Sequence, residues 1–158
     1  MAWRFGWSAE LPAYLAFGAV AAMVTATDLA ARRIPNRVVG PAFVVGPALL
    51  AAASAGTGSW WALARAAFGA VLLAGFYLAL GLGFPAGMGL GDVKWAGVIG
   101  LYVGYLGWRT LPTATLVAFA AAAVFVLGAR AAGRRRQLVL PMAPFMAAGA
   151  LVAVLATR

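Results

Sequence analysis

The stretch "GFPAGMGLGDVKWAG" (residues 83–97) places an aspartate, Asp92, between a glycine-rich segment and a long apolar run. The chain has only two other acidic side chains, Glu10 and Asp28, among its 158 residues. Carboxylates are expensive to keep near hydrocarbon, because burial removes the water that stabilises their charge. An acid in this position therefore needs a specific explanation, and the apolar run that follows it predicts the start of a membrane span.

The composition predicts an integral membrane protein. Hydrophobic residues make up 65% of the chain and charged residues 9%, whereas soluble domains are roughly half apolar. A membrane-spanning helix needs about 20 apolar residues, so the chain has room for about six spans. We predict an all-α, polytopic helical bundle that forms a single domain over residues 1–158. The apolar runs place the spans at 11–31, 38–55, 60–82, 93–108, 111–129 and 138–156.

Basic residues are concentrated in or directly next to the first, third and fifth predicted loops. The residues concerned are Arg32, Arg33, Arg37, Lys94, Arg130, Arg134, Arg135 and Arg136. The positive-inside rule places these loops in the cytoplasm and both termini outside. The net charge of +9 is then accounted for by orientation and by contact with anionic lipid, and no nucleic-acid partner is predicted. Asp28 and Asp92 come out on the same, cytoplasmic side.

Several kinds of chemistry are excluded by composition. The chain has no Cys and no His, which removes thiolate nucleophiles, Ser–His pairs and metal sites built from thiolate or imidazole ligands. We predict neither a metal nor a cofactor.

Glycines recur within the predicted spans and predict close helix packing, since the absence of a side chain lets backbones approach. The positions are Gly69, Gly75, Gly97, Gly100 and Gly104.

Each aspartate has a structural explanation when it is considered alone. Asp28 could form an ion pair with Arg32, one helical turn further on. Asp92 could cap a helix that begins at Val93, with its carboxylate accepting backbone N–H groups. Together, two acids on one side of the membrane favour a chemical role instead.

The segments "TDLAARRIPNRVVG" (residues 27–40) and "GMGLGDVKWAGVIG" (residues 87–100) resemble the two aspartate motifs of the type IV prepilin peptidases, which are membrane aspartyl proteases. In that family the first aspartate precedes an Ile-Pro-Asn element, and the second belongs to Gly-x-Gly-Asp followed closely by Lys. The matching residues are Asp28, Ile34, Pro35 and Asn36 in the first motif, and Gly89, Gly91, Asp92 and Lys94 in the second.

The resemblance implies that Asp28 and Asp92 form a catalytic dyad, because two carboxyls that share one proton can supply both a base and an acid. The other motif residues would be supporting. Gly89 and Gly91 are expected to take unusual backbone angles and to let a substrate strand approach. Lys94 either tunes the charge at Asp92 or extends to the interface.

In the first motif, Pro35 is expected to stiffen the loop and Asn36 to cap the second span. The substrate implied is a prepilin or pseudopilin, cleaved near the cytoplasmic face of the bacterial inner membrane. Because the chain lacks the cysteine-bearing insertion of larger members, it resembles the short, peptidase-only branch that serves tight-adherence pili, and no methyltransferase activity is expected.

Two other functions are compatible with the same residues. A small ion-coupled or proton-coupled transporter would use the aspartates to carry charge. An assembly scaffold would tolerate Asn at both positions.

Overall fold

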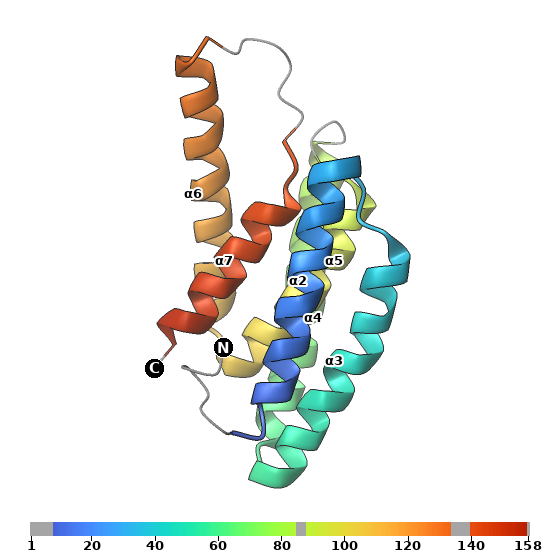
Figure 1. Cartoon of the computed structure of the whole chain (residues 1–158). Helices are drawn as coiled ribbons and strands as arrows, with labels where there is room; N and C mark the ends of the chain where they lie inside the picture. Colours follow the sequence, from blue (N-terminus) through green and yellow to red (C-terminus); the bar gives the residue numbers. More distant parts are fainter. Residues whose placement is uncertain (1–7, 85–87, 134–139, 158) are drawn as a thin grey trace.

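The computed structural model describes residues 8–84, 88–133 and 140–157, and the regular secondary structure in these ranges is entirely helical. The helices form one bundle (Figure 1). They are α2 (Leu11–Ala31), α3 (Asn36–Thr57), α4 (Trp60–Gly83), α5 (Leu90–Leu106), α6 (Thr110–Ala131) and α7 (Ala143–Ala156). The predicted spans are confirmed to within a few residues. The starts of two helices differ: α5 begins earlier than predicted, so Asp92 lies inside its first turn, and α7 begins later.

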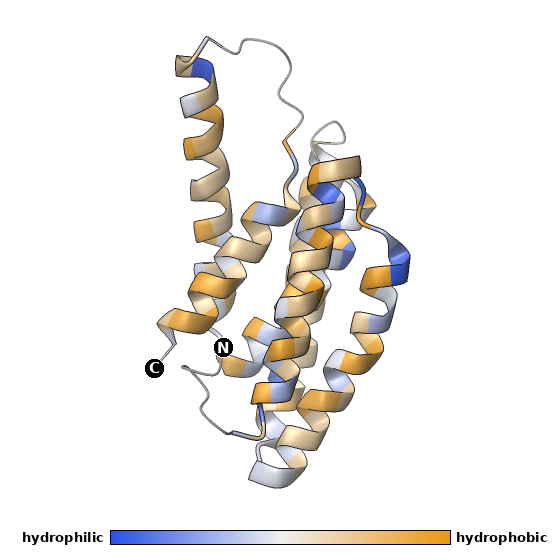
Figure 2. Cartoon of the chain, in the orientation of Figure 1, coloured by the Kyte–Doolittle hydropathy of each residue, from blue (hydrophilic) through white to orange (hydrophobic). Residues whose placement is uncertain are grey.

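Apolar residues predominate along the helices (Figure 2), and many large hydrophobic side chains are exposed on the outside of the bundle. Val44, Val71 and Val124 are each at least 70% exposed, which would be unfavourable in water and is normal against lipid. Four helices, α2, α3, α4 and α6, are long and apolar enough to cross a membrane. The other two are shorter, with 17 residues in α5 and 14 in α7. The chain is therefore a multi-pass membrane protein built as a helical bundle.

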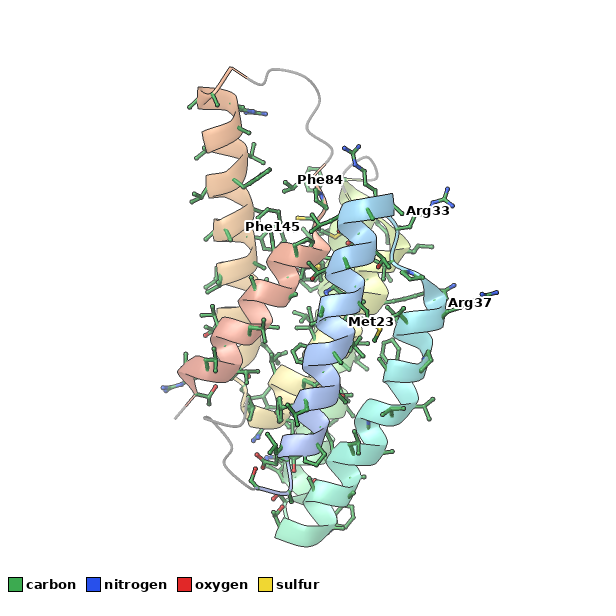
Figure 3. All side chains as sticks on the ribbon, in the orientation of Figure 1. Met23, Arg33, Arg37, Phe84 and Phe145 are labelled. Carbon is green, nitrogen blue, oxygen red and sulfur yellow. The ribbon has the colours of Figure 1, made fainter. Side chains whose placement is uncertain are left out.

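The helix ends are distributed as the charge pattern predicts. The C-terminal ends of α2, α4 and α6 lie at the upper end of the bundle in Figure 1, together with the N-terminal ends of α3, α5 and α7. Arg33 and Arg37 point outward at this end (Figure 3). Asp28 and Asp92 consequently belong to the same end of the molecule, and Glu10 lies at the other end, next to the start of α2.

Helix α5 is the centre of the bundle, because all its residues from Trp95 to Tyr105 are buried. Its contact with α2 is aromatic: the ring of Phe17 stacks on Trp95 with centroids 5.9 Å apart and packs against Tyr102 at 4.7 Å. The hydroxyl of Tyr14 donates a hydrogen bond to the backbone carbonyl of Tyr102 at 2.9 Å. These contacts fix the rotation of α2 relative to α5.

Helices α4 and α5 pack backbone against backbone. A Cβ atom added to Gly69 would lie 2.5 Å from the carbonyl oxygen of Gly100, and one added to Gly100 would overlap the carbonyl oxygen of Gly69. Gly104 lies in the same contact, and Gly97 receives the ring of Phe43. The prediction of glycine-mediated packing is confirmed at these positions.

At Gly75 the same prediction is wrong. A Cβ atom there would have no neighbour within 4 Å, because Gly75 is exposed on α4.

We expect Gly100→Ala to lower the free energy of unfolding by about 1–3 kcal/mol, as added atoms do in a fully packed contact. The control is Gly75→Ala, which adds the same methyl group to open space and should be neutral or slightly stabilising, since Ala favours the helix. Thermal unfolding of the detergent-purified protein measures both changes. Equal melting temperatures for the two variants would contradict the glycine contact.

Candidate active site

Asp28 lies three residues before the end of α2 and is 6% exposed. Its Oδ2 atom accepts a hydrogen bond at 3.1 Å from the backbone N–H of Ala143, the first residue of α7. A helix N-terminus has N–H groups without intrahelical partners and a positive partial charge, so it stabilises a carboxylate. The start of α7 therefore holds Asp28 in place.

Arg32, the predicted ion-pair partner of Asp28, has a different role. It ends α2 in a left-handed conformation with φ 50°, and its backbone N–H bonds to the backbone carbonyl of Asp28. Within the described residues no ion pair joins the two side chains, so this structural explanation for Asp28 is wrong.

Asp92 is the third residue of α5, and its Oδ2 atom accepts a hydrogen bond at 3.0 Å from the backbone N–H of Gly89. Its predicted role as a helix cap is confirmed, although the helix begins at Leu90 rather than Val93. A carboxylate has two oxygens with about four acceptor sites. Within the described residues, Oδ1 of Asp92 has no hydrogen-bond partner, so capping leaves half of the carboxylate available.

The fold brings the two carboxylates together from α2 and α5. They are near enough for the charge of Asp28 to act on Asp92. Each is held through one oxygen by one backbone N–H. Each aspartate therefore keeps its second carboxylate oxygen outside these two bonds.

The two sequence motifs contact each other directly. A Cβ atom added to Gly91 would lie 3.0 Å from the Cβ atom of Ile34, so the glycine leaves the space that Ile34 occupies. Beside this contact, Nζ of Lys94 donates a hydrogen bond at 2.9 Å to Oδ1 of Asn36. The turn between α2 and α3 is thereby attached to the first turn of α5, one residue from Asp92.

These contacts correct several of the predicted supporting roles. Gly89 is extended, with φ −93° and ψ 161°, and Gly91 is helical, so the expectation of unusual backbone angles is wrong. Asn36 does not cap α3: Pro35 occupies the N-cap position, and no side chain caps that terminus. Lys94 contacts Asn36 and forms no ion pair with Asp92 within the described residues.

Two residues of the site were missed by sequence reasoning. Tyr77 of α4 is 1% exposed, interacts electrostatically with Asp92 and stacks on Phe119 of α6 at 5.8 Å. Trp95 lies one helical turn beyond Asp92, is fully buried, and has an indole N–H without a partner in the described part of the chain. A lone phenol in the apolar α4 was the available signal for Tyr77.

The acidic side chains of the described residues do not form a group of three that could hold a metal ion. Glu10 is too far away to join the pair, since it lies at the opposite end of α2.

The type IV leader peptidase family model matches residues 15–127, which include both aspartates and most of the bundle. The chain belongs to the type IV leader peptidase family. No curated protein and no solved structure shows significant similarity to it. As a member of this family, the chain is a membrane protease of the leader-peptidase type. The match agrees with the resemblance of the two aspartate motifs to those of the type IV prepilin peptidases.

The contact between Gly91 and Ile34 can be tested in this leader peptidase by adding and then removing bulk. We expect Gly91→Val to slow leader removal about tenfold, because overpacking costs about 1–3 kcal/mol and here displaces the turn that follows Asp28. Adding Ile34→Ala should restore most of the activity, since it reopens the space. The rate at which reconstituted enzyme processes a prepilin is measured for Gly91→Val, Ile34→Ala and the double variant. Additive losses in the double variant would contradict direct contact.

Proposed function

We propose that this leader peptidase is an aspartyl endopeptidase that removes the leader peptide of a prepilin or pseudopilin, with Asp28 and Asp92 as its catalytic residues. One observation carries the proposal: Asp28 near the end of α2 and Asp92 in the first turn of α5 lie at the same end of the bundle, near enough to interact electrostatically. Each is held by a single backbone N–H, through Ala143 for Asp28 and Gly89 for Asp92.

The chemistry follows from two carboxyls that share one proton. The ionised carboxylate takes a proton from a water molecule as the water oxygen attacks the scissile carbonyl carbon, and the protonated carboxyl gives its proton to the carbonyl oxygen. The tetrahedral diol then returns one hydroxyl proton to the dyad. The dyad protonates the amide nitrogen as the carbon–nitrogen bond breaks, and it again holds one proton.

The membrane side is proposed from charge. Arg32, Arg33 and Arg37 lie at the turn beside Asp28, and Lys94 lies beside Asp92, so the positive-inside rule puts this end of the bundle in the cytoplasm. A prepilin leader is a short polar segment on the cytoplasmic side of one apolar helix. The dyad is then level with the bond to be cut, at the cytoplasmic face of the bacterial inner membrane. No cofactor is needed for this reaction.

The transporter alternative gains no support. An ion carrier places its acids near the bilayer midplane, whereas Asp28 is three residues from the end of α2 and Asp92 is in the first turn of α5.

We expect Asp28→Asn and Asp92→Asn each to reduce prepilin processing by at least about a hundredfold, because an amide can neither accept nor donate the catalytic proton. The matched control is Glu10→Gln, which removes the third acid of the chain at the far end of α2 and should process normally. Gel-shift assays of a co-expressed prepilin measure processing by the wild type and the three variants, after equal accumulation of these four proteins has been verified. Full activity in either aspartate variant would refute the dyad.

The initial rate of processing in proteoliposomes should depend on pH as a bell-shaped curve. At low pH both carboxyls are protonated and no base remains, while at high pH both are ionised and no acid remains. Both limbs belong to the pair rather than to one residue. Glu10→Gln should leave the curve unchanged. A rate that rises to a plateau without falling again would exclude a shared proton.

A further inference from the structure

A lateral groove in the membrane-embedded surface lies between α4 and α6. It has a volume of about 490 Å³, and its lining is aliphatic and aromatic apart from Thr115, whose hydroxyl bonds to the carbonyl of Leu111. The lining includes Leu72, Phe76, Trp108, Leu111, Pro112 and Leu116. Apart from the indole N–H of Trp108, the side chains of the groove offer almost only apolar surface, so its occupant must itself be largely apolar.

The groove has a floor and two walls. Leu73 and Leu111, at its floor, are only 7% and 8% exposed. The walls stand out from it, with Leu72 of α4 at 56% and Leu116 of α6 at 69% exposed. Both helices are candidate membrane spans, so any occupant enters sideways from the bilayer.

The groove continues toward the dyad. Leu73 and Thr115 also line a narrow crevice that reaches Tyr77 of α4 and Met146 of α7. Tyr77 in turn interacts with Asp92. In the upper half of the bundle, α6 diverges from α4 and α5 (Figure 1). The groove reaches Phe76, one residue before Tyr77, so an elongated apolar body that fills it points toward the end of the bundle that holds the two carboxylates (Figure 1).

We infer that this groove receives the apolar transmembrane helix of the substrate, with the leader at its cytoplasmic end held at Asp28 and Asp92. This inference rests on the proposed function, which requires a helix that crosses the bilayer next to the dyad. A lipid acyl chain would fit the apolar walls equally well, but it would have no reason to be aligned with the carboxylates. The groove therefore recognises the mature part of the substrate, and the dyad cuts the bond at its end.

Photo-crosslinking tests the location. A benzophenone amino acid is placed at Leu72 or Leu116 in the groove, or at Val71, which is 71% exposed on α4 and does not line the groove. Each is made in an Asp92→Asn background, so that uncut prepilin persists, and the membranes are irradiated. We expect prepilin adducts from the two groove positions and not from Val71.

The wild-type enzyme is assayed with the same prepilin in the same membranes, which separates two kinds of failure. If it cleaves the prepilin but the groove positions yield lipid adducts only, or adducts no stronger than those from Val71, the groove inference is overturned and the proposed function stands. If it does not cleave the prepilin, the proposed function fails and the inference falls with it.

A groove-filling variant gives a second, independent readout. Leu72→Trp should slow prepilin processing roughly tenfold, the loss expected when one well-packed anchor of an interface is blocked. The control, Val71→Trp, adds the same ring to the lipid-facing surface one residue away and should process normally. Equal melting temperatures for the two variants show that folding is intact. Equal processing rates in folded variants would contradict a helix in the groove.

Discussion

The burial of α5 is the constraint on which the rest of the structure depends. A helix can be fully covered by its neighbours in a membrane only if some of them come very close, because no hydrophobic force between helices drives them together. Gly69, Gly100 and Gly104 provide that closeness on the side of α4, and the aromatic contacts of Phe17 provide the packing on the side of α2. Once the rotation and the axial position of α5 are fixed, the position of Asp92 in its first turn is fixed as well.

The same constraint determines how the charges are held. In a medium of low dielectric constant, a guanidinium beside each carboxylate would bind it strongly and occupy its oxygens. The chain has many arginines, yet the carboxylates are held by backbone N–H groups at the starts of α7 and α5. A single neutral donor stabilises each charge and leaves the second oxygen accessible. Helix termini thus position the pair without neutralising it.

The sequence was sufficient for the helices and for the placement of both aspartates at one end of the bundle, and the reasons are local. Apolar runs of about 20 residues, basic loops and two rare acids are each visible without tertiary information. The contacts that could not be predicted from the sequence depend on which helices pack against each other in the fold. That Ala143 would face Asp28, or Tyr77 approach Asp92, depends on how α7 packs against α2 and how α4 packs against α5, and no local pattern encodes it.

The corrections at Gly91, Asn36 and Lys94 have one common cause. Considered separately, each residue suggested a role in its own segment: a flexible turn, a helix cap, a charge near Asp92. In the fold they form one contact, since Ile34 fills the space at Gly91 and Lys94 bonds to Asn36. This contact lies six to eight residues after Asp28 and within two residues of Asp92. The residues that accompany each aspartate in its motif therefore pack against those of the other motif, and together they attach the turn after Asp28 to the first turn of α5.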